Sequence, residues 1–271
     1  SSCHFYFSCF ECQQAVLMPS HAASILRDAS GYRRLCAESN AKAGEPLVTE
    51  EPLLFVPGDP SCIILEAPGG QALLEAGKAL GDLRPLGAYA AYAALPCERR
   101  AAVDCFRGEV GAAPLRASQL AVDNLLAADP ALAAAADWPE VLRLLGILIS
   151  NAVQLEDGGL ALYEYIAAGN HSCVPNCDIV RPQFSRAAGK TIQAKAVLRA
   201  IKDIDAHEEL TYSYVPSLVL LAPTKDRRDF LRIHRGFLCK CTSCQGYAER
   251  LRLKRRLWHG GKFKRHRGLG V

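Results

Sequence analysis

The chain has 271 residues, of which 50% are hydrophobic and 22% are charged. This is enough apolar material for the core of one large domain or two small ones, and it excludes disordered, collagen-like and coiled-coil proteins. The formal net charge of +4 hides an uneven distribution, because nine basic and no acidic residues follow Glu249. The rest of the chain contains 23 basic and all 28 acidic residues, which gives it a net charge of −5. The sequence predicts an acidic body joined to a basic tail.

The chain also contains 12 cysteines. Its first residues lack the basic and apolar regions of a signal peptide, and no apolar run approaches the roughly 20 residues of a membrane helix. We therefore expect a cytoplasmic or nuclear protein, or one found in both compartments, with no membrane partner. Clustered cysteines in such compartments favour metal binding over disulfides. The chain starts with serine rather than methionine, which suggests a fragment of a longer protein.

Residues 1–30 are rich in cysteine and aromatic residues and show no periodicity. The spacing of Cys9-Phe-Glu-Cys12 suits zinc, so Cys3, Cys9, Cys12 and His21 form a weak candidate for a second metal site. The run from Gly44 to Phe55 predicts a turn followed by an extended segment. Its two prolines suit only an edge strand or the end of a strand.

Residues 70–155 are rich in alanine and leucine and are punctuated by prolines, which predicts several short helices. One longer helix is expected where apolar residues recur at helical spacing, from Trp138 to Ile149. Strands are expected again after Leu160, over 191–198 and 209–215. Thr224 is the predicted cap of a helix that ends at Gly236. The order of elements is β, then a helical insert, then β.

Three cysteines lie within six residues in the run Cys239-Lys-Cys241-Thr-Ser-Cys244. Three thiolates at this spacing can surround one ion, but zinc in a structural site takes four ligands, so the fourth has to come from elsewhere. The alternative is a group of free buried thiols, because buried cysteine is also a common inert core residue.

Three motifs occur in a fixed order: Asn170-His171-Ser-Cys173-Val-Pro-Asn176, then Glu208-Glu-Leu-Thr-Tyr212-Ser-Tyr214, then Phe237-Leu-Cys-x-Cys-x2-Cys. Together they resemble the core and post-SET region of SET-domain protein lysine methyltransferases, over roughly residues 31–245. The closest subgroup is the one that carries a MYND zinc finger. No MYND finger is recognisable here, because residues 56–70 contain only Cys62.

The resemblance implies an α+β protein with the mostly β SET fold, which has small sheets and a pseudoknot-like core, together with a helical insert and a zinc-binding post-SET segment. The implied division of the chain is an N-terminal Cys-rich segment (1–30), an N-terminal SET portion (31–69), the helical insert (70–150), the core SET region (151–215), the post-SET zinc segment (216–247) and the basic tail (248–271).

The resemblance further implies methyl transfer from S-adenosylmethionine to a lysine side chain. A basic, lysine-containing protein, histone or not, is the expected substrate, and an acidic body suits it. A monomer is expected. The tail suits nuclear import or phosphate contacts with nucleic acid, although a merely solvated tail is the alternative. The competing interpretation of the whole chain is an inactive, zinc-stabilised SET interaction module.

Individual residues take their implied roles from the family motifs. Asn170 and His171 match positions that hold the cofactor, and Tyr214 matches the catalytic tyrosine beside the transferring methyl group. Phe237 matches the aromatic residue that packs on adenine. Asn151, at the end of the long helix, matches an asparagine that contacts the cofactor, with plain solvent contact as its alternative.

Tyr212 matches a second tyrosine of the active site that often decides how many methyl groups are added, and a phenol there predicts monomethylation or dimethylation. Tyr163 either lines the lysine channel or fills the core. Cys173 matches the family's fourth zinc ligand. The implied zinc site is Cys173, Cys239, Cys241 and Cys244, and Cys177 is a rival to Cys173 because of its close spacing.

Two positions depart from the family pattern. Tyr32-Arg33-Arg34 stands where a Gly-x-Gly motif lets the backbone approach the cofactor. Two cations near a sulfonium are unfavourable unless their guanidinium groups face the cofactor carboxylate. His207 replaces a glycine before Glu208, and histidine is among the residues that tolerate a positive φ there.

Overall fold

The structure, a computed structural model, describes residues 22–29, 32–108, 113–180 and 195–246. Its strands are β1 (Ala23–Arg27), β2 (Arg33–Ala37), β3 (Pro46–Glu50), β4 (Leu54–Val56), β5 (Val153–Gln154), β6 (Leu160–Leu162), β7 (Asn170–His171), β8 (Cys177–Val180), β9 (Ala196–Ala200) and β10 (Thr211–Tyr212). Its helices are α1 (Ser61–Glu66), α2 (Gly70–Leu80), α3 (Arg84–Ala93), α4 (Cys97–Asp104), α5 (Ala113–Ala128), α6 (Trp138–Asn151), α7 (Ser217–Leu220) and α8 (Thr224–Arg235), with 3-10 turns η1 (Pro130–Ala134) and η2 (Ile166–Ala168).

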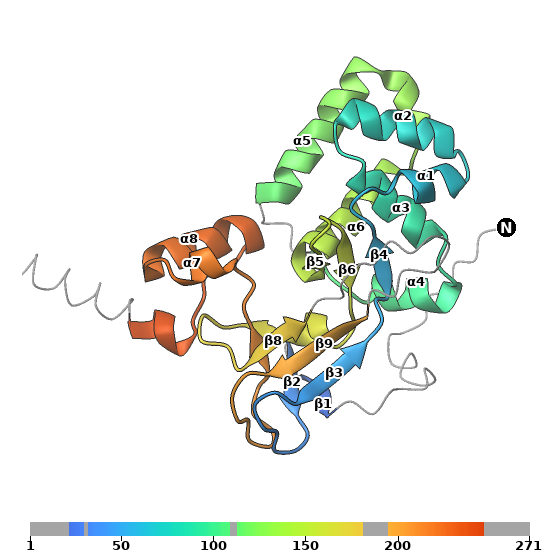
Figure 1. Ribbon diagram of the computed structural model, residues 1–271. Helices are drawn as coiled ribbons and strands as arrows, with labels where there is room; N and C mark the ends of the chain where they lie inside the picture. The colour runs from blue at the N-terminus through green and yellow to red at the C-terminus, as the bar shows by residue number, and fades with distance from the viewer. Residues whose placement is uncertain (1–21, 30–31, 109–112, 181–194, 247–271) are drawn as a thin grey trace, which may run out of the picture.

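Small sheets join strands that are far apart in the chain. Strand β9 lies between β3 and β8, and β6 lies between β4 and β5, in both cases with antiparallel neighbours. A separate antiparallel hairpin is formed by β1 and β2. Figure 1 shows β3, β8, β9 and the β1–β2 hairpin at the bottom, β4–β6 beside α6, and α7 and α8 standing apart at the left. The predicted α+β architecture of small sheets with a helical insert is confirmed.

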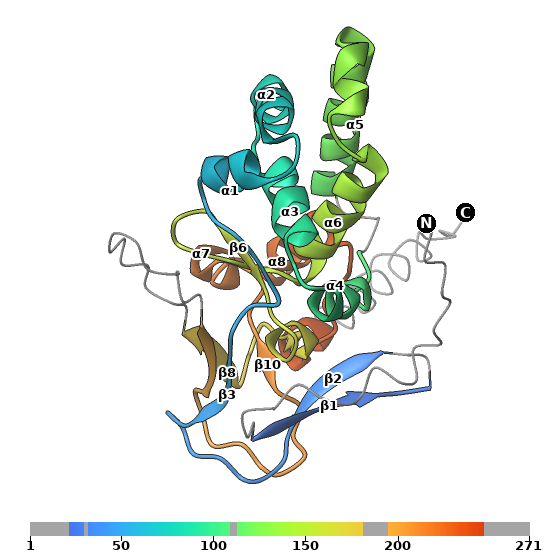
Figure 2. The ribbon, with the colours of Figure 1, turned by 90° about the vertical axis from the view of Figure 1, so that its right-hand side faces the viewer.

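The helical unit α1–α6 interrupts the chain between β4 and β5. Figure 2 shows α2 and α5 projecting away from the sheets. The helices begin at Ser61, earlier than the predicted boundary at residue 70, because a short apolar run such as Cys62 to Leu65 suits a strand as well as a helix. Within the described residues, no helix has the length and apolar character needed to cross a bilayer.

Several strands and helices begin or end at the prolines and capping residues of the sequence. Pro46 is the first residue of β3, and Pro52 lies between β3 and β4, as expected for residues that cannot donate to a ladder. The helix α6 starts after Asp137, whose carboxylate accepts the N–H of Glu140 at 3.2 Å. The predicted strand over 209–215 is wrong in its length, because only Thr211–Tyr212 forms a strand. The start of the strand expected over 191–198 lies outside the described residues.

The helices α7 and α8 and the chain that follows them, in which residues 242–246 are helical, form a C-terminal segment, residues 216–246. Thr224 does not cap α8 as predicted: it is the first helical residue, and Pro223 precedes it. The helix ends at Gly236, which has a φ of 77° and is therefore the predicted left-handed stop. The core beneath this segment is small, with only Val215, Leu231, Cys239 and Cys244 buried in it.

The turn before β10 contains a strained residue. His207 has a φ of 66°, the one positive value among the described residues other than glycine. Its N–H donates to the Ala37 carbonyl at 2.8 Å, which holds the turn against β2. The sequence anticipates this conformation, because the family has glycine here.

Substituting a β-branched residue at this turn is expected to destabilise the protein. His207→Val should lower the free energy of unfolding by about 1–2 kcal/mol, because a branched Cβ is disfavoured at positive φ. His207→Gly is the matched control and should be neutral or stabilising by up to about 1 kcal/mol, since glycine removes the strain but adds unfolded-state entropy. Urea titration measures both, and an equal loss in the two variants would contradict the explanation from backbone strain.

Candidate functional site

Two short strands bring the first two motifs together. The parallel pairing of β7 with β10 places Asn170 opposite Thr211 and His171 opposite Tyr212. Residues about forty positions apart in the chain therefore become neighbours. The candidate site is built around the β7–β10 pair, because side chains of both strands lie close together there.

Two asparagine amides hold the strands in position. The side-chain amide of Asn170 donates to the Arg33 carbonyl at 3.1 Å and to the Glu209 carboxylate at 2.7 Å. Asn176 is only 3% exposed. Its Oδ1 accepts the N–H of Thr211 at 2.7 Å, and its Nδ2 donates to the Glu209 carbonyl at 2.8 Å. The sequence predicts no separate role for Asn176. The hydrogen-bond partners of a buried amide depend on the tertiary fold and cannot be inferred from the sequence.

The imidazole of His171 connects the strand pair to the cysteines. Its Nδ1 accepts the backbone N–H of Tyr214 at 3.0 Å, so the neutral ring carries its proton on Nε2. Nε2 lies 3.4 Å from Sγ of Cys173. Burial, together with the charges of Arg235 and Arg227, lowers the pKa of His171 to about 4. The ring is therefore uncharged near neutral pH.

Two tyrosines meet at Gly169. The Tyr214 hydroxyl donates to the Gly169 carbonyl at 2.7 Å, and the ring centroids of Tyr212 and Tyr214 are 5.1 Å apart. A Cβ on Gly169 would lie 3.0 Å from Cε1 of Tyr212, so a larger residue here would crowd the ring. Burial raises the pKa of Tyr214 to about 12 and that of Tyr212 well above its usual value. Both phenols are neutral at physiological pH.

The C-terminal segment adds an aromatic wall. The chain leaves α8 through the left-handed turn at Gly236, and Phe237 then faces the strand pair. Its ring centroid is 6.1 Å from that of His171 and 6.2 Å from that of Tyr214, edge-on in the second case. The Arg235 guanidinium lies 5.6 Å from the Tyr214 ring centroid. Three aromatic rings and one cation thus come together from segments that the sequence separates.

The C-terminal end of α6 reaches the same place. Arg235 donates to the Ile149 carbonyl at 2.7 Å, which ties α8 to α6. Asn151 Oδ1 accepts from Arg33 at 3.4 Å, and its Nδ2 donates to the Ile147 carbonyl at 2.9 Å. Asn151 therefore contacts protein groups rather than solvent alone, and its implied contact with the cofactor stays a prediction.

Four cysteines form a compact cluster beside His171. The sulfur atoms of Cys173, Cys239, Cys241 and Cys244 all lie within 4.8 Å of one another. Sγ of Cys173 is 3.9 Å from that of Cys239 and 3.6 Å from that of Cys244. Zinc–sulfur bonds of about 2.3 Å in a tetrahedron separate the sulfurs by about 3.8 Å, so the four residues fit a structural zinc ion. The rival Cys177 is buried on β8, outside this cluster.

A cleft of 1060 Å³ opens over these residues. The five residues implied to bind the cofactor all line it, namely Asn151, Asn170, His171, Tyr214 and Phe237. Tyr212 is 9% exposed and lies beneath, against Tyr214. The structure therefore brings the candidate cofactor residues, Tyr214 included, to one cleft, and two of the four cluster cysteines, Cys239 and Cys241, line it as well.

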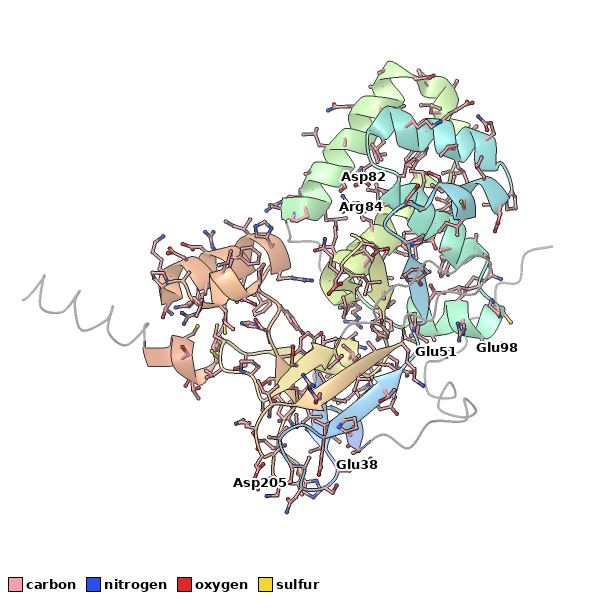
Figure 3. All side chains as sticks on the ribbon, viewed as in Figure 1. Glu38, Glu51, Asp82, Arg84, Glu98 and Asp205 are labelled. Atoms are coloured by element: carbon pink, nitrogen blue, oxygen red, sulfur yellow. The ribbon has the colours of Figure 1, made fainter. Side chains whose placement is uncertain are left out.

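The charge of the cleft differs from that of the body. Cations outnumber carboxylates among its lining residues, with Arg27, Arg33, Arg107, Lys202, Arg235 and Lys240 against Glu208 and Glu209. Other acidic side chains lie on the outer surface, as Figure 3 shows for Glu38, Glu51, Glu98 and Asp205, or pair with nearby cations, as Asp82 does with Arg84 at 2.8 Å. The negative balance predicted for the body does not extend into the cleft.

The two cations that replace the glycine motif point in different directions. Arg33 lines the cleft and its guanidinium lies 4.7 Å from the Phe106 ring centroid. Arg34 is exposed and is not among the lining residues. Arg33 and Arg34 are consecutive residues of β2, and consecutive side chains of a strand point to opposite faces. Of these two cations, only Arg33 therefore lines the cleft.

The segment before β7 is fixed by a buried carboxylate. Tyr163 is fully buried in the core, which is the second of its two predicted alternatives. Glu50 is 8% exposed and accepts backbone N–H groups of Glu164, Tyr165 and Ile166 at 2.7–3.2 Å. Burial raises the pKa of Glu50 to about 7, although the three N–H donors oppose that rise. No pattern in the sequence signals this role for a glutamate on a strand.

Two further predictions fall on residues that the structure does not describe. The proposed second zinc site consists of Cys3, Cys9, Cys12 and His21. The basic tail, from which import or nucleic-acid contacts are expected, spans 248–271. Both lie outside the described residues.

Comparison with known proteins gives a consistent set of matches. Residues 33–215 match the family model for the SET domain. The chain is 39% identical over 97 residues to "Histone-lysine N-methyltransferase SMYD3" of Homo sapiens, covering 36% of this chain and 19% of that protein. It is 36% identical over 116 residues to "N-lysine methyltransferase SMYD2-B" of Danio rerio, covering 40% of this chain and 24% of that protein. The chain therefore spans about a fifth to a quarter of these relatives.

One solved structure is also similar to this chain. It is titled "Crystal structure of the SET domain of LSMT bound to Lysine and AdoHcy", with a TM-score of 0.43 and 14% identity, covering 83% of this chain and 54% of that one.

Proposed function

The chain belongs to the SET-domain family, and on that premise we propose that it transfers a methyl group from S-adenosylmethionine to the side-chain nitrogen of a protein lysine. The observation that carries the proposal is the cleft in which Asn170, His171, Tyr214 and Phe237 come together. Relatives whose names state lysine methyl transfer support it.

The reaction is an in-line displacement. Bound S-adenosylmethionine supplies an electrophilic methyl group on a positively charged sulfur. The lone pair of the lysine nitrogen forms the new N–C bond while the C–S bond breaks, and the bonding pair stays on sulfur. The lysine, whose pKa is ordinarily about 10.4, first has to lose a proton to water, which desolvation in a narrow apolar channel favours. Holding the two reactants in line is the largest contribution, about 7–11 kcal/mol in favourable cases.

The residues of the cleft suit these tasks. Neutral phenols and an uncharged imidazole surround a sulfonium with electron-rich groups without offering a competing nucleophile. We assign the position beside the transferring methyl group to the Tyr214 hydroxyl, which the Gly169 carbonyl orients at 2.7 Å. Phe237 offers a face for the adenine ring, and Asn170 with His171 holds the rest of the cofactor. Arg33, beside Asn151, is the cation suited to the cofactor carboxylate.

Calorimetric titration of the zinc-loaded protein with S-adenosylmethionine, followed by a methyl-transfer assay on an array of lysine-containing proteins, tests the proposal. Saturable binding together with labelled lysine is expected. A folded, zinc-loaded protein that binds no cofactor would instead favour an inactive interaction module.

Tyr212 allows a prediction about the product. Tyr212 is 9% exposed, and its phenol lies beside Tyr214. In that position the hydroxyl can retain a water molecule that hinders rotation of an already methylated amine. The wild type should produce mainly monomethyl-lysine, with some dimethyl-lysine, and Tyr212→Phe should shift the product towards higher methylation. Mass spectrometry of the modified substrate measures both, with Tyr92→Phe as the control. Predominant trimethyl-lysine from the wild type would contradict this role.

Three further proposals rest on the sequence alone: a basic character of the substrate, a cytoplasmic or nuclear location, and nucleic-acid contacts through the tail. The cationic lining of the cleft does not support the first of these.

A further inference from the structure

Arg227 is a buried cation without an acidic partner. It lies in the first turn of α8 and is 8% exposed. Among the ion pairs of the described residues, none includes Arg227. A buried guanidinium without an opposite charge is unfavourable, because the ion loses its hydration when the protein folds. A negative charge beside Arg227 would therefore stabilise the folded protein.

The hydrogen bonds of Arg227 do not supply that charge. Its Nη1 donates to the Ala222 carbonyl at 2.6 Å. Its Nη2 donates to the hydroxyl oxygens of Thr224 at 3.2 Å and Ser243 at 3.0 Å. All three acceptors are neutral, and Nε is buried with no hydrogen-bond partner. The hydrogen bonds fix the position of the guanidinium but leave its charge uncompensated.

The cysteine cluster lies against the same guanidinium. Arg227 interacts with the side chains of Cys173 and Cys244, which come from the two segments that form the cluster. Four thiolates around one Zn²⁺ carry a net charge of −2, and this charge also lies in a partly buried environment. The positive charge of Arg227 and the negative charge of the zinc–thiolate cluster therefore offset each other.

We propose that Arg227 is the charge partner of the four-cysteine zinc site, where it offsets part of the net negative charge and positions the segment 239–244, which contains three of the four cysteines. The proposal rests on the zinc site described above. Through Ser243, the same side chain joins the start of α8 to the metal-binding segment 239–244. Outer partners of this kind typically change metal affinity by about 10–100-fold.

Metal affinity of three variants tests the proposal. Arg227→Met keeps the bulk but removes the charge, and Arg227→Lys keeps the charge but loses the planar fork. Arg232→Met, on the exposed side of the same helix, is the matched control because its partner is Asp229 and its side chain is 58% exposed. Zinc affinity is measured by competition with a chromogenic chelator, and the ligand set is checked from the thiolate charge-transfer band of the Co²⁺-substituted protein.

Arg227→Met should bind zinc about 10–100-fold more weakly than the wild type while keeping a tetrahedral thiolate spectrum with Co²⁺. Arg227→Lys should stay within about tenfold of the wild type and Arg232→Met should be unchanged. Wild-type affinity in Arg227→Met, or an equal loss in Arg227→Lys, would overturn the proposal. If Arg227→Met does not fold, Arg227→Gln, which is also uncharged, takes its place with the same expected loss. Absence of the thiolate band in the wild type would instead remove the zinc site, and neither readout depends on methyl transfer.

Discussion

Removal of zinc is expected to abolish cofactor binding and to unfold the C-terminal segment. Two of the four residues buried in the core of this segment are the ligands Cys239 and Cys244, so little apolar burial is left to hold it without metal. Structural zinc contributes about 10–16 kcal/mol in small domains, more than this core can replace. Phe237 lies two residues before Cys239, so the aromatic wall of the cleft is lost with the metal.

Chelation followed by calorimetry measures this effect. Zinc-free protein should show no binding of S-adenosylmethionine, and its thermal unfolding should begin with an early transition for the C-terminal segment. Zinc added back should restore both. Cys244→Ser should behave like the zinc-free protein, whereas Cys97→Ser, which changes an exposed cysteine outside the cluster, should behave like the wild type. Unchanged cofactor affinity after complete zinc removal would contradict a structural role for the metal in the cleft.

Tyr214→Phe is expected to reduce the rate of methyl transfer by about 10²-fold or more, with little change in cofactor affinity. The substitution keeps the ring contacts with Phe237 and Arg235 and removes only the hydroxyl that the Gly169 carbonyl orients. A hydroxyl that acts mainly in the transition state lowers kcat when it is lost, rather than raising KM.

Single-turnover kinetics separate the effect on kcat from the effect on KM. The substrate is a protein from the array that the wild-type enzyme methylates. Tyr92→Phe is the matched control, because it removes a hydroxyl that bonds Asp104 at 2.8 Å in the helical unit and does not line the cleft. Zinc content is measured in both variants to exclude loss of the metal. Activity that survives Tyr214→Phe undamaged would overturn the assigned role of this hydroxyl.

Local spacing in the sequence predicted the elements and the motifs. The stop at Gly236, the positive φ at His207 and the prolines at the ends of β3 depend on the backbone geometry of single residues, which a sequence specifies directly. The three clustered cysteines likewise indicate a metal through spacing alone, and the family motif supplied Cys173 as the fourth ligand.

Tertiary structure decided which of these residues meet and in what environment. Pairing of β7 with β10 placed His171 between Tyr214 and Cys173, and the alternation along β2 separated Arg33 in the cleft from Arg34 outside it. The buried partners of Glu50, Asn176 and Arg227 have no local signature, because burial and charge compensation arise only when distant segments pack together. The sequence thus determined the chemistry available at the site, and long-range packing determined the distances and burial that give each group its role.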